Sequence, residues 1–272
     1  MSDKHIATNN NNSNVSILIF GIGLLAVVMA ISQYAFRRGK PVCSHFILNT
    51  YMYVVASLLI ISLFVIGLER YPGLNPYHYT NLSNRGLGLV SWLLMLVAVL
   101  LVLFITMNIN PNKVFSKHFS WIVLLYLLSI IFYPSYYLSR EMNLFFSTLA
   151  TVGVMMVLLT LFAFLKPEWI SLDWGPVLLV ALVAAIVLHL IMIFSGIAWN
   201  RGGLAKWLAW FLVFLFSAFI LYDTKKLQVL ATRCRVDSNN RLERPDYINH
   251  SLGFLLDLLN LFISLLRGQA LN

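Results

Sequence analysis

Charge is scarce in this sequence. Only 11% of the 272 residues are charged, ten of them acidic and 19 basic, whereas 60% are hydrophobic. Soluble domains are typically about 25% charged and about 45–50% apolar. The shortage of charge therefore argues against a soluble domain. Because the apolar residues form long continuous runs, the composition favours a protein that crosses a membrane several times.

Cysteine is equally scarce. Cys43 and Cys234 are the two cysteines of the sequence, and both lie in short polar stretches. Two residues so far apart provide neither a disulfide framework nor the spacing of a metal centre. We expect both to be reduced thiols that face the cytosol.

The common motifs of catalysis and nucleotide binding are also missing. The sequence has no phosphate-binding loop, no HExxH and no GxSxG. The net charge of +9 comes from lysines and arginines at the ends of apolar runs, where they orient helices and meet lipid headgroups. It does not form the basic stripe of a nucleic-acid-binding surface. We therefore expect neither an enzyme nor a nucleic-acid-binding protein, and no resident cofactor.

Eight apolar runs of about 20 residues each are present, and about 20 helical residues cross a bilayer core roughly 30 Å thick. Backbone groups in lipid must be satisfied internally, so we predict helices, and an all-α polytopic membrane bundle as the fold class. The predicted spans are 15–36, 46–68, 87–107, 119–138, 142–165, 177–199, 204–223 and 248–267. Residues 1–14 are polar and Asn-rich, and we predict a disordered tail there.

The first run has two interpretations. The segment "VMA" at 28–30 resembles a signal-peptide cleavage site, but the run is long for a signal peptide. Arg37, Arg38 and Lys40 follow the run directly. This arrangement favours an uncleaved span with its N-terminus on the non-cytosolic side.

The distribution of basic residues supports the same orientation. With eight spans and a non-cytosolic N-terminus, twelve basic residues fall on the cytosolic side and seven on the other. The twelve are residues 37, 38, 40, 113, 117, 166, 225, 226, 233, 235, 241 and 244, and the seven are residues 4, 70, 85, 140, 201, 206 and 267.

Few ionisable residues lie inside the predicted spans. A charged side chain at the bilayer centre costs about 2.5–3.5 kcal/mol, so such residues usually face the protein interior and serve a function. The candidates are Asp223, Asp257 and His189, with His250 near a helix end. His189 is interpreted either as a hydrogen-bonded core histidine or as part of a proton path.

The last span carries a polar stripe. Its residues are spaced by 4, 4, 3 and 4 positions, which places them on one face of a helix: Asn249, Gly253, Asp257, Asn260 and Ser264. Packing between helices accounts for the small residues of this stripe, but a carboxylate in lipid requires a partner or a proton. The opposite face is apolar and suits lipid or packing: Phe254, Leu255, Leu258, Phe262 and Leu265.

Two short segments resemble the Bax inhibitor motif family of membrane proteins. They are "LYDTKKL" at 221–227 and "DLLNLFISLLR" at 257–267, and weaker similarity occurs at 142–165 and 45–62. The resemblance implies a seven-helix domain over 45–272, built around a central helix. The helix at 15–36 is then an addition at the N-terminus.

The resemblance also implies a function. Members of the family are linked to calcium leak from intracellular stores and to suppression of cell death. In the family, the aspartates that match Asp223 and Asp257 form a proton-sensitive pair at the cytosolic mouth of the pore. The neighbours Tyr222, Asn249, His250, Asn260 and Ser264 would then support that pair. The basic partner expected in the family's second helix is absent from the matching span here.

Two carboxylates in contact do not readily ionise together and tend to share one proton. Without that proton, Asp223 and Asp257 would repel each other or bind Ca²⁺ transiently, because Ca²⁺ prefers oxygen ligands. We predict a pH-sensitive calcium leak channel of an intracellular membrane, in the endoplasmic reticulum, Golgi or mitochondrion. Its partners would be lipid, calcium or protons, and other membrane proteins. A non-conducting subunit of a membrane complex and a proton-coupled transporter remain as alternatives.

Overall fold

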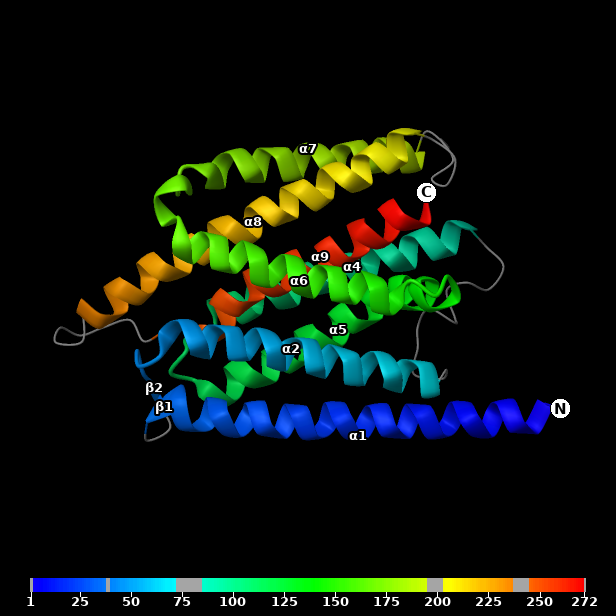
Figure 1. Cartoon of the computed structure of the whole chain (residues 1–272), viewed down its shortest axis with the longest axis horizontal. Helices are drawn as coiled ribbons and strands as arrows, with labels where there is room; N and C mark the ends of the chain where they lie inside the picture. The colour runs from blue at the N-terminus through cyan, green and yellow to red at the C-terminus, as the bar shows by residue number, and fades with distance from the viewer. Residues whose placement is uncertain (1, 38–39, 72–84, 195–202, 237–244, 272) are drawn as a thin grey trace. The chain divides into compact units, whose positions relative to one another are not determined.

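The computed structural model describes residues 2–37, 40–71, 85–194, 203–236 and 245–271, which are almost entirely helical (Figure 1). The α-helices are α1 (Ser2–Tyr34), α2 (Phe46–Arg70), α4 (Arg85–Asn108), α5 (Val114–Glu141), α6 (Phe145–Leu165), α7 (Trp174–Phe194), α8 (Gly203–Val236) and α9 (Tyr247–Ala270). A 3₁₀ turn, η2, covers Pro167–Trp169. Strands β1 (Phe36–Arg37) and β2 (Lys40–Pro41) pair antiparallel.

The prediction of an all-α membrane bundle is confirmed. Each predicted span coincides with one helix, and six described helices are long and apolar enough to cross a membrane: α2, α5, α6, α7, α8 and α9. Shorter apolar stretches, Leu18–Tyr34 and Leu93–Asn108, belong to α1 and α4. Large apolar side chains on several of these helices are exposed, as expected for surfaces that contact lipid.

Two helix ends differ from the prediction. Helix α1 begins at Ser2, so residues 2–14 have helical backbone instead of the predicted disorder. Adding a residue to an existing helix costs far less than nucleating one, and the apolar run that follows supplies the nucleus. Helix α8 continues to Val236, 13 residues past the predicted end at Asp223. Packing explains this extension, because Leu227 is buried and the Gln228 side chain donates to the Ala163 carbonyl at 3.0 Å.

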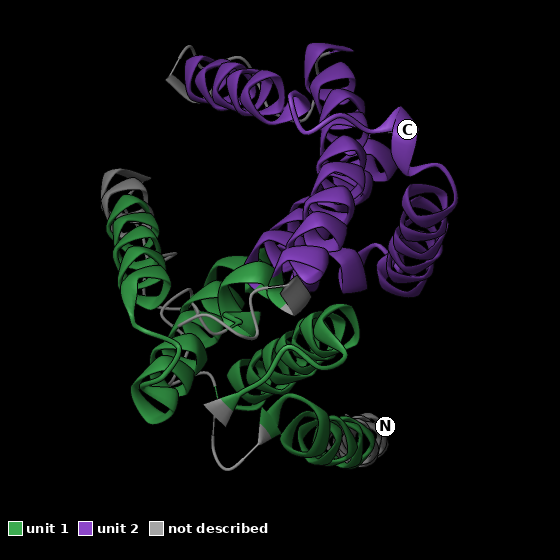
Figure 2. Cartoon of the chain, turned by 90° about the vertical axis from the view of Figure 1, so that its left-hand side faces the viewer, with its two compact units in different colours: residues 1–134, 234–251 green, residues 135–233, 252–272 purple. Residues whose placement is uncertain are grey.

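The chain forms two compact units, coloured separately in Figure 2. Unit 1 comprises residues 1–134 and 234–251. Within it α1 packs along α2, and Gly23 of α1 lies against the Leu59 side chain of α2. Its centre is aromatic: Tyr53 stacks on Tyr247 with ring centroids 6.0 Å apart and meets Trp121 edge-on at 5.6 Å.

Unit 2 comprises residues 135–233 and 252–272. It holds α6, α7, most of α8 and most of α9. Helix α9 is the most thoroughly buried of the six long spans. Its apolar face was assigned to lipid or packing, and the structure selects packing, because each of the five side chains is at most 4% exposed: Phe254, Leu255, Leu258, Phe262 and Leu265.

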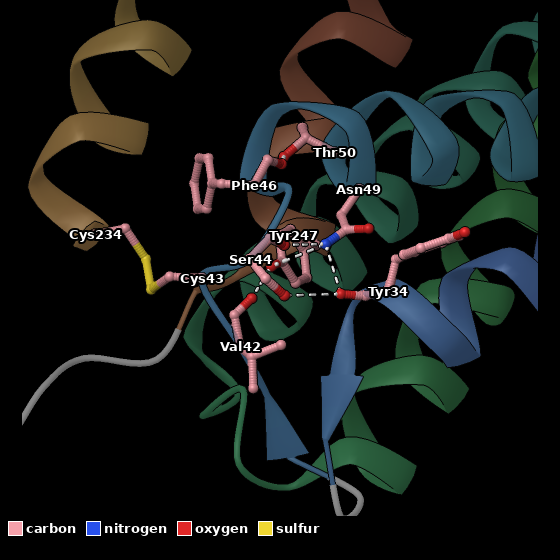
Figure 3. Close-up of a disulfide and its surroundings, with 9 residues drawn as sticks. All are labelled: Tyr34, Val42, Cys43, Ser44, Phe46, Asn49, Thr50, Cys234 and Tyr247. Carbon is pink, nitrogen blue, oxygen red and sulfur yellow. Dashed lines mark hydrogen bonds between the residues drawn. A yellow bond between two sulfur atoms is a disulfide. The ribbon is translucent and has the colours of Figure 1, made fainter. Parts of the chain in front are cut away.

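The expectation of two reduced thiols is wrong for this structure. Cys43 and Cys234 are joined by a disulfide in unit 1, with their Cα atoms 5.8 Å apart (Figure 3). Their separation of 191 residues hides this proximity from the sequence. It arises because the extension of α8 carries Cys234 to the segment that leads into α2.

Candidate functional site

Asp257 lies in the middle of α9 and is only 7% exposed. Among the described residues, its Oδ2 atom is buried without a hydrogen-bond partner. Buried polar atoms in proteins are almost always paired, so an exception calls for an explanation. A proton shared with another group, or an ion present for part of the time, would provide one.

Asp223 is the acidic residue that lies near Asp257. A Cβ atom added at Gly253 would collide with Oδ2 of Asp223, so this carboxyl group lies directly against the α9 backbone. Gly253 precedes Asp257 by four residues, or about one helical turn of 5.4 Å on the same face. The absence of a side chain at Gly253 therefore brings the two carboxyl groups close together within unit 2.

The two carboxyl groups interact through their charges. Asp223 is the charged group that acts on Asp257, and Lys226, three residues further along α8, acts on Asp223. The described hydrogen bonds include none between the two carboxyl groups. The structure therefore places the Asp223 carboxyl group about one helical turn from Asp257 along α9.

Three predicted supporting residues also lie in unit 2. The Tyr222 hydroxyl would be 2.6 Å from a Cβ at Gly175, so this side chain fills the space that the glycine leaves at the start of α7. The Asn260 amide donates to the Leu256 carbonyl at 2.8 Å, and Ser264 is buried. Asn260 and Ser264 extend the polar face of α9 beyond Asp257.

The structure places the other two supporting residues in unit 1. The Asn249 side chain accepts a hydrogen bond from Lys117 Nζ at 2.8 Å and donates to the Met107 carbonyl at 2.9 Å. The His250 ring packs on Phe46 with centroids 5.6 Å apart. These contacts anchor the start of α9.

Lys117 is a residue that sequence reasoning missed, because we counted it only as a topology signal. Its side chain is 3% exposed and its ammonium group pairs with Asp246 at 2.7 Å. It also donates to the carbonyls of Thr106 at 2.7 Å and Ile109 at 3.0 Å. Its side-chain partners Asp246 and Asn249 are 129 and 132 positions away, so no local pattern in the sequence indicates the pairing. Asp246 caps α9 by accepting the backbone N–H of Asn249 at 3.0 Å.

His189 lies in a small pocket of unit 2, lined by Arg267 and apolar side chains such as Met192 and Leu212. Its Nδ1 is 3.1 Å from the Ala185 carbonyl, and its Nε2 is 3.3 Å from a guanidinium nitrogen of Arg267. A carbonyl and a guanidinium fix the tautomer, so Nδ1 donates and Nε2 accepts. This bonding matches the interpretation of His189 as a hydrogen-bonded core histidine.

The described residues contain no cluster of three or more His, Cys, Asp or Glu side chains that would hold a metal ion. Two carboxylates alone provide a weak oxygen site, since Ca²⁺ takes six to eight ligands.

A family model described as "Inhibitor of apoptosis-promoting Bax1" matches residues 43–270, which is most of the chain. Helix α1 lies outside the matched range. No curated protein matches the chain.

Proposed function

The chain belongs to the family described as "Inhibitor of apoptosis-promoting Bax1", and on this premise we propose that it is a pH-sensitive calcium leak channel of an intracellular membrane. By setting how much calcium the store retains, it would modulate cell death. It is a multi-pass membrane protein with no enzymatic activity of its own in this proposal. Calcium is the permeant ion, not a resident cofactor.

The buried, unpartnered oxygen of Asp257 carries the proposal. A charge at the bilayer centre costs about 2.5–3.5 kcal/mol on insertion scales, so an ionised Asp257 would be expensive unless something compensated it. A hydrophobic residue would avoid that cost, and helix packing alone does not require a carboxylate. A second acidic group one turn away increases the cost of full ionisation, as expected for a group that exchanges protons or cations.

The pH response follows from the charges of the two carboxyl groups. At low pH the carboxyl groups of Asp223 and Asp257 carry at most one negative charge between them. As the pH rises, the second charge appears in a buried site where Lys226 is the opposing charge that acts on Asp223. Repulsion between the charges then favours separation of α8 from α9 at Gly253, or entry of a cation. Either change alters calcium passage between acidic and neutral pH.

The orientation is part of the proposal. Twelve basic residues against seven favour a cytosolic location for the connections between α1 and α2 and between α8 and α9. The N-terminus is then on the non-cytosolic side. In this orientation, the C-terminal part of α8, which carries Asp223, lies toward the cytosol, so the pair would respond to cytosolic pH.

Calcium flux into liposomes tests the function. The full chain would be purified and reconstituted into vesicles that contain a calcium indicator, with protein-free vesicles as the control. We expect calcium entry above the control, and we expect this entry to depend on external pH.

The same assay separates the alternatives. A non-conducting subunit would give no flux at any pH and would copurify with a larger membrane complex. A proton-coupled transporter would move protons only when its substrate is present. Either result would replace the channel proposal.

A further inference from the structure

The two cysteines of the chain form a site that the channel proposal does not use. The disulfide links the segment just before α2 to the last turn of α8, and both cysteines are partly exposed (Figure 3). Cys43 and Cys234 are the only cysteines in the sequence, so the described bond leaves no thiol for alternative pairing. A small molecule can reach such a bond, because neither cysteine is enclosed in the core.

We propose that Cys43 and Cys234 form a reversible thiol–disulfide exchange site, closed by a low-molecular-weight disulfide of the glutathione class and opened by the corresponding thiol. The proposal goes beyond calcium leak, and it rests on the membrane orientation proposed above but not on ion conduction. In this account the disulfide is a clamp between the start of α2 and the end of α8 that follows the redox poise of its compartment.

The basic residues near both cysteines indicate a cytosolic location, where a disulfide is expected to be reversible. Both cysteines lie in connections assigned to the basic side of the membrane: Arg37, Arg38 and Lys40 precede Cys43 closely, and Arg233 and Arg235 flank Cys234. Basic connections face the cytosol. Disulfides in the cytosol are usually transient, because glutathione and thioredoxin keep thiols reduced. Glutathione disulfide is anionic, so basic flanks also favour its approach.

The surroundings of Cys43 would keep the two sulfurs near each other when the bond is open. The Tyr247 hydroxyl donates to the carbonyl of Val42, the residue before Cys43 (Figure 3). The Asn49 amide donates to the carbonyl of Ser44 at 2.8 Å and to that of Tyr34 at 3.2 Å. These bonds hold the segment from both sides without the disulfide. The reduced protein should therefore remain folded and able to close again.

The clamp would act on the helix that carries Asp223. Helix α8 runs without a break from Asp223 to Cys234, a distance of 11 residues or about three turns, so the two residues point to nearly the same side. Fixing Cys234 to Cys43 restrains the end of α8. Reduction removes that restraint while leaving the rest of the helix in place.

The thiol–disulfide exchange proceeds in two steps. The thiolate of one cysteine attacks glutathione disulfide, which forms a mixed disulfide and releases one glutathione. The thiolate of the second cysteine attacks the protein sulfur of that mixed disulfide, which forms the Cys43–Cys234 bond and releases a second glutathione. The two protein thiols lose two protons and two electrons, and glutathione disulfide gains the electrons and is reduced to two thiols.

Thiol trapping across a redox series tests the proposal. The full-length protein in detergent would be equilibrated at several ratios of reduced to oxidised glutathione, and free thiols would then be tagged with a maleimide that adds visible mass. We expect the population to pass from two tags to none within the range of cytosolic glutathione ratios. Single variants C43S and C234S should instead form only a mixed glutathione disulfide under oxidising conditions.

Two results would overturn the proposal. The bond could persist at every glutathione ratio, which would make it a fixed structural disulfide and place this side of the membrane in an oxidising compartment. Alternatively, both thiols could stay free even in excess glutathione disulfide, which would mean that the two cysteines do not meet. Neither result depends on calcium flux, so this test is separate from that of the channel.

A melting experiment separates a clamp from a bond that the fold requires. The reduced wild-type protein should melt cooperatively at the temperature of the C43S/C234S double variant, and the oxidised wild-type protein should melt several degrees higher. Loss of the folded state on reduction would contradict a reversible clamp.

Discussion

Two aspartates on or beside α9 have opposite surroundings. Asp246, directly before the helix, caps it and pairs with Lys117, whose ammonium group is bound by four oxygens. Asp257, 11 residues later, has a buried oxygen without a partner among the described residues, and the charge that acts on it is negative. The first aspartate belongs to unit 1 and the second to unit 2.

This contrast distinguishes an aspartate that stabilises the fold from one that can exchange a proton or bind a cation. Every proton of Lys117 has an oxygen acceptor, so removing either partner leaves a buried charge uncompensated. Asp257 has no such compensation. Removing its charge should therefore change the pH dependence of calcium flux more than the stability of the fold. The predictions below test this division.

Breaking the Lys117 site should have the largest effect. Lys117→Met removes the cation and leaves the half-buried carboxylate of Asp246 without its counter-ion, so we expect destabilisation of about 3 kcal/mol, the lower end of the cost of breaking a buried pair. The exposed Lys113→Met is the matched control and should change stability by less than about 0.5 kcal/mol. Unfolding in detergent measures both. Adding Asp246→Asn to Lys117→Met should recover part of the loss, and no recovery would contradict the ion-pair interpretation.

Filling the space at Gly253 should have an intermediate effect. The methyl group of Gly253→Ala would collide with Oδ2 of Asp223. Because that oxygen ends a rotatable side chain, the carboxyl group can turn aside, so we expect a cost of about 1 kcal/mol, the lower end of the range for overpacking. Gly153→Ala is the control, because a Cβ there meets nothing within 4 Å, and alanine favours a helix by about 1 kcal/mol. Combining Gly253→Ala with Asp223→Ala should restore stability. If Gly253→Ala is as stable as Gly153→Ala, the close approach of α8 to α9 is wrong.

His189 should have the smallest effect. His189→Gln keeps an acceptor for Arg267, so we expect a change in stability below about 1 kcal/mol and an unaltered pH dependence of calcium flux. Flux in liposomes and thermal unfolding measure these quantities. A pH profile that shifts with His189 would assign this residue to a proton path and favour the transporter alternative.

Hydropathy in the sequence located the eight α-helices of the described residues, since each apolar run is long enough to span a bilayer. It could not locate the end of α8, because Lys225 and Lys226 suggest a boundary at the membrane surface. The helix continues through them because Leu227 is buried and Gln228 bonds to Ala163. Local composition indicates where a helix could end, but tertiary packing determines where it does end.

The candidate site was predictable in part. The spacing on α9 identified Asp257 as an inward-facing carboxyl group, and the family resemblance supplied Asp223. The role of Gly253 was not predictable, because it depends on which part of α8 crosses that point. Lys117 pairs with Asp246, which is 129 positions away, and the disulfide joins cysteines that are 191 positions apart. A single sequence carries no signal for contacts at that separation.

The pH profile of calcium flux tests the central claim that Asp223 and Asp257 act as a coupled switch. Wild-type protein, the Asp223→Asn/Asp257→Asn double variant and Asp173→Asn, an exposed aspartate at the start of α7, would be compared in liposomes from acidic to neutral pH. The account predicts that flux through the wild type and Asp173→Asn changes with pH, while flux through the double variant stays nearly constant. The same pH profile in all three proteins would contradict it.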